Sequence, residues 1–401
     1  MIVLAGAAIV QAGGMMPRGT IVIGDGRILS VEEGDRPTPP GATRLDLDGH
    51  LVVPGFIDVH VHGVEGIDVL DGPGAVAAVA ARLPRYGVTA FCPTSVACDP
   101  RVLGSFLGEV AALAGAPPGA GARVLPAHLE SNFLNPAYRG AQPASCLRRP
   151  PAPGAVPRAA AGADDAFTGA DILAVIDEWR AAVGIVTLAP ELPGGLDLTR
   201  RLAAGGIRVS MGHTAATYDE ARAAIAAGAR HATHLFNRMP PLGHRAPGAA
   251  GAVLASELVA AEIICDGVHV HPSMIALAVS RLGVGRVLGI TDGTAGSGLP
   301  AGSRARLGGQ EIIVTTQAAE LPDGTLAGSV LTMDGAFRVL VDAVGLDEPA
   351  AARVLSTTPA EQLGLADAGV IRAGARADLA VLDADRRVRQ TFVAGRPALE
   401  H

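Results

Sequence analysis

Apolar, strand-like runs alternate with stretches of helical spacing along the middle of the chain. Eight such runs end near the following residues: His60, Cys92, Glu130, Ala189, His213, His234, Cys265 and Asp292. The stretches between most of them are rich in Ala, Leu and Arg, as at 74–86, 170–183 and 218–227. Strand–helix alternation indicates a parallel sheet, and eight units suit a closed barrel. The sequence therefore predicts an α/β fold, a (β/α)8 TIM-like barrel.

The two ends of the chain differ from its middle. Residues 20–24 and 27–31 flank Asp25-Gly26, which is a two-residue signal for a β-hairpin. Residues 378–383 and 388–393, near the other end, are also strand-like. Two β-rich ends around a different middle predict one small β-sandwich domain formed from both termini.

We expect this small domain to comprise residues 1–53 and 347–401, and the (β/α)8 barrel to comprise residues 54–346. Within the barrel, segment 131–169 is too long for an ordinary connection and is rich in Pro, Gly and Arg. Such a segment is typical of a functional loop or lid.

The composition excludes several kinds of chemistry. The chain of 401 residues contains no lysine, so all 32 of its basic residues are arginines. This excludes a P-loop, a Schiff-base enzyme and a metal pair bridged by a carbamylated lysine. The net charge is −7 and only 3% of the residues are aromatic, so the composition gives no indication of a nucleic-acid-binding surface. The most apolar later stretch, 249–265, is interrupted by Glu257 and Glu262, which argues against a membrane span.

Cysteine usage indicates the compartment. Four cysteines in so long a chain do not make a disulfide framework, so we expect a reducing, cytoplasmic setting.

A pair of histidines closes the first barrel strand. His60 and His62 are two residues apart, and side chains at this spacing on a strand point the same way. Both imidazoles can therefore reach one metal ion. Taken alone, the pair is about as consistent with surface or core histidines as with a ligand pair.

Further metal-binding residue types recur at other strand ends. These residues are Glu130 on the third strand, His213 on the fifth, His234 on the sixth and Asp292 on the eighth. The C-terminal ends of barrel strands converge on one rim, where catalytic groups lie. Several histidines with two carboxylates there match a divalent metal site, zinc or similar, that keeps positions open for water. If two ions bind, Glu130 is the candidate bridging ligand, because the chain has no lysine.

An ordered set of motifs carries a resemblance to a known superfamily. The motifs are PGFIDVHVHG at 54–63, AHLE at 127–130, MGH at 211–213, THLFN at 233–237, ICDGVH at 264–269, ITD at 290–292 and TLAGS at 325–329. With them, the chain resembles the amidohydrolase superfamily and, within it, the N-acetylglucosamine-6-phosphate deacetylase family. The resemblance covers nearly the whole chain and implies metal-dependent hydrolysis of an N-acetyl amide.

The resemblance also implies roles for the rim residues. Glu130, His213 and His234 would hold the principal metal ion. His60 and His62 would complete a second site, which some members of the family possess. Asp292 would be the general acid/base, which takes a proton from the attacking water and later delivers one to the leaving amine.

Other positions match the substrate-binding residues of the family. His269 would contact the substrate near its carbonyl or hydroxyl groups. Asn237 and Arg245 would hold the phosphate, with Arg245 supplied by the partner subunit of a homodimer. Gln142 is compatible with part of the family. Tyr138 stands where the family has a basic residue.

The remaining departures surround the substrate. Arg238 replaces a small residue, and Ser131-Asn132 follows Glu130 where Gly-Pro is usual. Two anionic substrates therefore stay open. One is N-acetylglucosamine 6-phosphate or a related amino-sugar phosphate. The other is an N-acetyl amino acid or N-acetyl β-amino acid, whose carboxylate would meet Arg238 or Arg245.

A non-catalytic binding protein on the same fold is a remote alternative. It would require the loss of a metal ligand or of the acid/base, and all of these residues are present.

Overall fold

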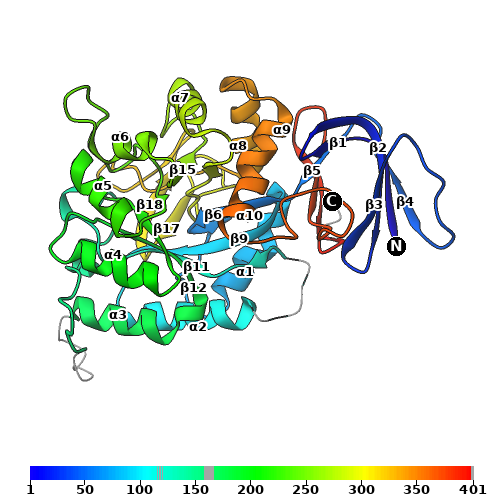
Figure 1. Cartoon of the computed structure of the whole chain (residues 1–401). Coiled ribbons are helices and arrows are strands. Elements are labelled where there is room, and N and C mark those ends of the chain that lie inside the picture. The colour runs from blue at the N-terminus through cyan, green and yellow to red at the C-terminus, as the bar shows by residue number, and fades with distance from the viewer. Residues whose placement is uncertain (115, 117–118, 120, 158–166, 399–401) are drawn as a thin grey trace.

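A closed barrel of parallel strands forms the larger part of the molecule (Figure 1). The structure, a computed structural model, describes residues 1–114, 116, 119, 121–157 and 167–398. Within these residues the barrel strands are β6 (Phe56–Val61), β9 (Val88–Ser95), β11 (Ala127–Glu130), β12 (Val183–Leu188), β13 (Arg208–Met211), β14 (His231–Ala232), β15 (Ala260–Ile264) and β16 (Val287–Ile290). Each strand pairs in parallel with the next in this order. The Asp292 amide donates to the His60 carbonyl over 2.9 Å and joins the last strand to the first. The predicted (β/α)8 barrel is confirmed.

Helices follow the strands and surround the barrel (Figure 1). They are α1 (Ala75–Arg82), α2 (Pro100–Ala114), α3 (Gly169–Glu178), α4 (Gly195–Ala204), α5 (Tyr218–Ala227), α6 (Gly248–Ala255), α7 (Pro272–Leu282) and α8 (Met333–Arg338). Local sequence sets several of the boundaries. Thr168 and Thr217 begin α3 and α5 with reciprocal capping boxes, which satisfy amide groups at the helix start. The expected helix at 74–86 ends early in a 3₁₀ turn, Leu83–Tyr86, that contains Pro84.

Alternate residues of the strands fill the interior of the barrel with apolar side chains. This cluster includes Ile57, Val59, Ala90, Cys92, Ile185, Ala260, Ile264, Leu288 and Ile290. Their spacing of two follows from the pleat of a strand, which turns alternate side chains to the same face. A packed apolar layer therefore lies below the rim that carries the polar residues.

Strands from both ends of the chain form one further sheet, in the order β22-β21-β20-β5-β1-β2-β3 with β4 beside β1. Their bounds are β1 (Ile2–Gln11), β2 (Gly14–Gly24), β3 (Arg27–Glu33), β4 (Thr43–Asp46), β5 (Leu51–Pro54), β20 (Leu379–Leu382), β21 (Val388–Val393) and β22 (Arg396–Pro397). Register shifts interrupt β1, and apolar side chains from both termini, among them Ile21, Val52 and Phe392, pack into one cluster. The predicted turn at Asp25-Gly26 adopts left-handed φ values of 52° and 76°.

The expected domain boundaries at residues 53/54 and 346/347 stay a prediction. Two short helices, α9 (Glu348–Ala352) and α10 (Thr358–Gln362), follow the second boundary and lie where the barrel meets the additional sheet (Figure 1). Ala351 in α9 packs in the apolar cluster that the barrel shares with its helices.

Some elements near the rim were not predicted. A small sheet of β17 (Arg304–Leu307), β18 (Gln310–Val314) and β19 (Ala319–Glu320) is inserted between β16 and α8, and β7 (Gly63–Val64) pairs with β8 (Ile67–Asp68). The expected loop at 131–169 contains 3₁₀ turns at Pro136–Tyr138 and Ala144–Cys146, while its residues 158–166 lie outside the described part. No helix among the described residues is long and apolar enough to cross a membrane.

Candidate functional site

Three polar residues leave the ends of barrel strands in an unusual backbone conformation. The φ values of His213, His234 and Asp292 are 46°, 29° and 48°. They lie in the left-handed region, which residues other than glycine rarely adopt. The sequence had placed them at the strand ends, but each lies two residues beyond its strand. The left-handed turn is the reason, because it breaks the ladder and turns the side chain over the barrel. Strain of this kind concentrates at functional sites.

A first cluster joins Glu130, His213 and His234. Glu130 Oε1 lies 2.6 Å from His213 Nε2 and 2.9 Å from His234 Nε2, and the two Nε2 atoms are 3.1 Å apart. All three residues are buried. His213 Nδ1 lies 2.8 Å from the Tyr138 carbonyl, so Nδ1 carries the proton and Nε2 presents a lone pair. The donor set of the cluster therefore fits a divalent cation such as zinc.

A second cluster joins His60, His62 and Asp292. The two Nε2 atoms are 3.3 Å apart, and Asp292 Oδ1 lies 3.3 Å from His60 Nε2 and 3.2 Å from His62 Nε2. His62 Nδ1 lies 2.9 Å from the carbonyl of Thr94, which leaves a lone pair at its Nε2. This set also fits a metal ion. Glu130 lies between the clusters, since its Oε2 is 3.6 Å from His62 Nε2.

The two carboxylates of the rim are held in their ionised form. Burial by itself raises the pKa of Glu130, but the imidazoles of His213 and His234, when they carry a proton on Nε2, hold that pKa well below its usual range, and a metal ion in the same place acts in the same direction. Burial acts in the same direction on Asp292, where the protonated forms of His60 and His62 outweigh it and lower the pKa. The carboxyl group of Asp292 is therefore ionised at neutral pH.

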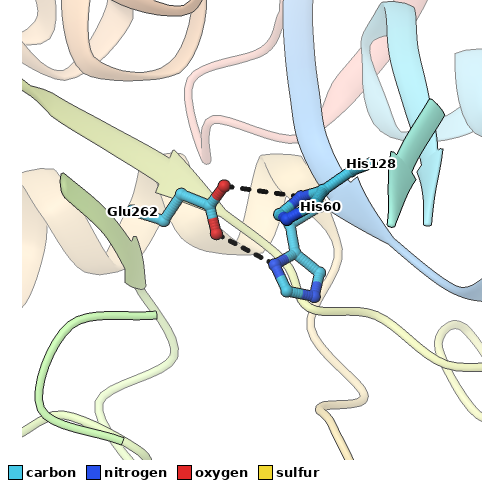
Figure 2. Close-up of side chains that lie close together, drawn as sticks. All are labelled: His60, His128 and Glu262. Atoms are coloured by element: carbon cyan, nitrogen blue, oxygen red, sulfur yellow. Dashed lines mark hydrogen bonds and ion pairs between the residues drawn. The ribbon is translucent and has the colours of Figure 1, made fainter. Parts of the chain in front are cut away.

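Beneath the rim lies a third group that includes Glu262 and two histidines (Figure 2). Glu262 Oε2 lies 2.9 Å from His60 Nδ1, and Glu262 Oε1 lies 3.5 Å from His128 Nδ1. Glu262 was not predicted as a site residue. Its only signal in the sequence is a carboxylate inside the apolar strand Ala260–Ile264. Burial lowers the pKa of His128 to about 3, so this histidine is neutral.

A cavity of about 490 Å³ opens above the two metal clusters, a size that suits a small molecule. Five of the expected substrate contacts line it: Tyr138, Gln142, Asn237, Arg238 and His269. Asn237 Nδ2 is buried and has no hydrogen-bond partner among the described residues, so it is a donor available to a ligand. His269 Nδ1 pairs with Asp266 Oδ2 over 2.6 Å. Arg245 is exposed, before α6, and does not line this cavity.

Gln142 and Tyr138 line the cavity and also form hydrogen bonds with members of the first cluster. The Gln142 side chain donates to Glu130 Oε2 and accepts from the Ala97 amide, so protein groups occupy both of its ends. Tyr138 orients His213 through its backbone carbonyl, a contact that its side-chain type could not have indicated. The assigned roles of both residues toward substrate stay a prediction.

The chain is similar in sequence to known proteins. The model of the amidohydrolase family matches residues 196–398. An N-acetylglucosamine-6-phosphate deacetylase of Danio rerio is 37% identical over 363 residues, covering 88% of this chain and 85% of the relative. The enzyme of the same name from Bacillus subtilis is 33% identical over 397 residues, covering 97% and 94%.

Solved structures agree with these relatives. The N-acetyl-D-glucosamine-6-phosphate deacetylase of Mycobacterium smegmatis, solved as a mutant in complex with N-acetyl-D-glucosamine-6-phosphate, has a TM-score of 0.87 and 33% identity, covering 100% of this chain and 99% of that one. The enzyme from Thermotoga maritima has a TM-score of 0.82 and 28% identity, with full coverage of both chains. Sequence and fold thus agree over the full length, and the chain belongs to the amidohydrolase family and, within it, to the N-acetylglucosamine-6-phosphate deacetylases.

Proposed function

We propose that this protein is a metal-dependent deacetylase that hydrolyses the N-acetyl amide of N-acetylglucosamine 6-phosphate or a related amino-sugar phosphate. The observation that carries this proposal is the convergence of Glu130, His213 and His234 at the floor of a cavity of small-molecule size. Relatives of this name cover nearly the whole chain, which supports the same reaction.

The proposed chemistry divides between a cation and the residues of this chain. Glu130, His213 and His234 would hold a divalent cation, which would supply Lewis acidity toward the amide carbonyl and the attacking water. Asp292 accepts a proton from the attacking water and returns it to the nitrogen of the leaving amine. Asn237 and His269 hold the substrate by hydrogen bonds to its oxygen atoms.

We also propose the finer properties of the holoenzyme. Zinc suits the imidazole and carboxylate donors, and the two clusters accommodate one or two ions. The four cysteines are free thiols, which suits the cytoplasm. A homodimer would allow Arg245 of one subunit to reach the cavity of the other, because this exposed arginine does not line its own.

A second candidate substrate is an N-acetyl amino acid or N-acetyl β-amino acid. It is favoured by Arg238, which lines the cavity and whose guanidinium can pair with a carboxylate as readily as with a phosphate. The reaction would be the same amide hydrolysis, carried out by an acylase.

A substrate panel tests both candidates. Zinc-loaded enzyme is assayed for acetate release from N-acetylglucosamine 6-phosphate, N-acetylgalactosamine 6-phosphate and N-acetylated α- and β-amino acids. We expect turnover of an amino-sugar phosphate, with inorganic phosphate as a competitor. Turnover confined to the amino acids would replace the first candidate by the second, and turnover of none would refute both.

A further inference from the structure

Glu262 is a fully buried carboxylate in the interior of the barrel, below the metal clusters. It lies on β15 with Ala260 and Ile264 two residues to either side, and both of these belong to the apolar cluster inside the barrel. The pleat of the strand therefore turns Glu262 inward as well. A buried carboxylate in such surroundings is costly unless it is hydrogen-bonded, so its partners reveal its role.

The partners of Glu262 connect it with the rim. His60 Nδ1 donates to Glu262 Oε2 over 2.9 Å, and His231 Nε2 donates to Oε1 over 3.0 Å. The backbone amide of His234 also points at Oε2, at 3.4 Å. The proton on Nδ1 of His60 leaves a lone pair on its Nε2, which is the atom that faces His62 and Asp292.

The support of His60 differs from that of the other rim histidines. The Nδ1 atoms of His62 and His213 each rest on a backbone carbonyl, from Thr94 and Tyr138. His60 alone among these three rests on a charged carboxylate. Such a partner fixes the ring and its tautomer and strengthens the opposite nitrogen as a metal ligand.

The lower group is not itself the cation site. Its ring nitrogens are already used within the protein: His128 Nδ1 donates to the Val59 carbonyl over 3.0 Å, and His128 Nε2 pairs with the Thr187 hydroxyl over 2.7 Å. The His128 ring stands edge-on to His60, with centroids 4.6 Å apart. Figure 2 shows how Glu262 meets both rings.

We propose that Glu262 is the positioning residue of the second cation site, the one formed by His60, His62 and Asp292. It holds the Nε2 lone pair of His60 toward that site and raises its strength as a donor. The inference rests on the proposed function only in taking these three residues to bind a cation. Glu262 acts through His60 and does not touch the substrate.

A structural role is the competing explanation, because Glu262 also binds His231 and the backbone of His234. The test therefore needs a readout other than folding or turnover. Calorimetric titration of the metal-free full chain with Co²⁺ resolves a first and a second equivalent without any substrate. Failure of the proposed deacetylase activity would leave this measurement intact.

Two variants of Glu262 remove, completely or in part, the carboxylate that accepts the hydrogen bond from His60 Nδ1. Glu262→Leu removes it, and we expect the second Co²⁺ to bind about 10–100-fold more weakly while the first is unchanged. Glu262→Gln keeps an oxygen that can accept from His60 Nδ1, and we expect an intermediate loss. If the leucine variant does not fold, the glutamine variant still decides, because a weaker second ion with an unchanged first supports the proposal.

His231→Phe is the matched control. It removes a neighbour of Glu262 at the same depth but leaves the bond to His60 in place, so we expect the second ion to bind as in the parent chain. In the Co²⁺ enzyme, proton NMR should show a hyperfine-shifted, exchangeable Nδ1–H resonance of His60 that Glu262→Leu eliminates. The proposal is overturned if the parent binds a single ion, if both ions weaken equally, or if His231→Phe behaves like Glu262→Leu.

Discussion

Replacing Asp292 by Asn tests the proposed proton transfer directly. Asp292 lines the cavity, is 7% exposed and has a lowered pKa, so it is available as an ionised base. Asn has nearly the same volume and tolerates the left-handed φ of 48°. The backbone bonds of this position to His60 and Ser329 do not involve its side chain and are retained. The variant should therefore fold normally and lose only the carboxylate.

The expected loss follows from the role of a general base. Such a group contributes roughly 10²–10⁴-fold to a rate, which corresponds to about 3–5 kcal/mol of activation free energy. The loss should appear in kcat with the zinc-loaded enzyme. The first metal cluster does not include Asp292, so the ion held by Glu130, His213 and His234 should remain.

The assay pairs initial rates with the metal content of the same samples. Asp292→Asn should keep at least one ion per chain and the melting temperature of the parent while kcat falls by the stated factor. If kcat stays within about threefold of the parent with the ion bound, the carboxylate does not move the proton. Loss of the first ion would refute the separation of the two clusters instead.

Four further perturbations examine the bound cation, the contact with the anionic group of the substrate and the protonation of the pocket. Chelation should abolish hydrolysis and lower thermal stability, and zinc at a hundredfold excess over its Kd should restore both and add about 2.7 kcal/mol to the free energy of unfolding. An unchanged melting curve would contradict a bound ion. Arg238→Ala should raise KM for the sugar phosphate about tenfold with little change in kcat, roughly 1.4 kcal/mol. Gly140→Ala should act alike, because its added Cβ would lie 2.7 Å from Arg238 Nε, and an equal effect on uncharged N-acetylglucosamine would contradict the anion contact. Burial lowers the pKa of His269, but the bond to Asp266 outweighs it, so the pKa is raised and the imidazolium persists to higher pH. Asp266→Asn should therefore move the alkaline limb of kcat/KM to lower pH, and an unmoved limb would show that His269 does not control it.

The barrel and the placement of its rim could be predicted because they depend on local rules. Parallel strands end on one side of a sheet, and residues two apart on a strand share a face. These rules suffice to bring His60 beside His62 and to place Glu130 near both. The distribution of residue types at strand ends then indicates a cation without any knowledge of loop structure.

The backbone of the rim could not be predicted in the same way. The left-handed turn at His213 depends on hydrogen bonds between distant segments, since the Asn135 amide donates to the His213 carbonyl over 3.0 Å. The Thr214 amide donates to the Arg238 carbonyl over 3.1 Å, which holds the next residue. Sequence patterns describe neighbours along the chain, whereas these bonds join loops that follow different strands.

Glu262 escaped prediction for a related reason. In the sequence it is one carboxylate within an apolar run, and it counted only as evidence against a membrane span. Its partners lie 31 residues away at His231 and 202 residues away at His60, so no local spacing connects them. Only closure of the barrel brings the three side chains together.

Two levels of polar residues lie inside the barrel: the group around Glu262 and, above it, the rim with the two metal clusters. They differ in how their charged groups are paired. At the lower level, Glu262 accepts from ring nitrogens, and both nitrogens of His128 have partners within the protein. At the rim, the lone pairs of His62 and His213 face carboxylate oxygens, which cannot donate. The lower level therefore satisfies its carboxylate within the protein, whereas at the rim a positive charge must lie between the ring nitrogens and the carboxylates, either a metal ion or a second proton on the imidazoles. Because His60 belongs to both levels, it is where the rigid interior of the barrel sets the geometry of the metal site.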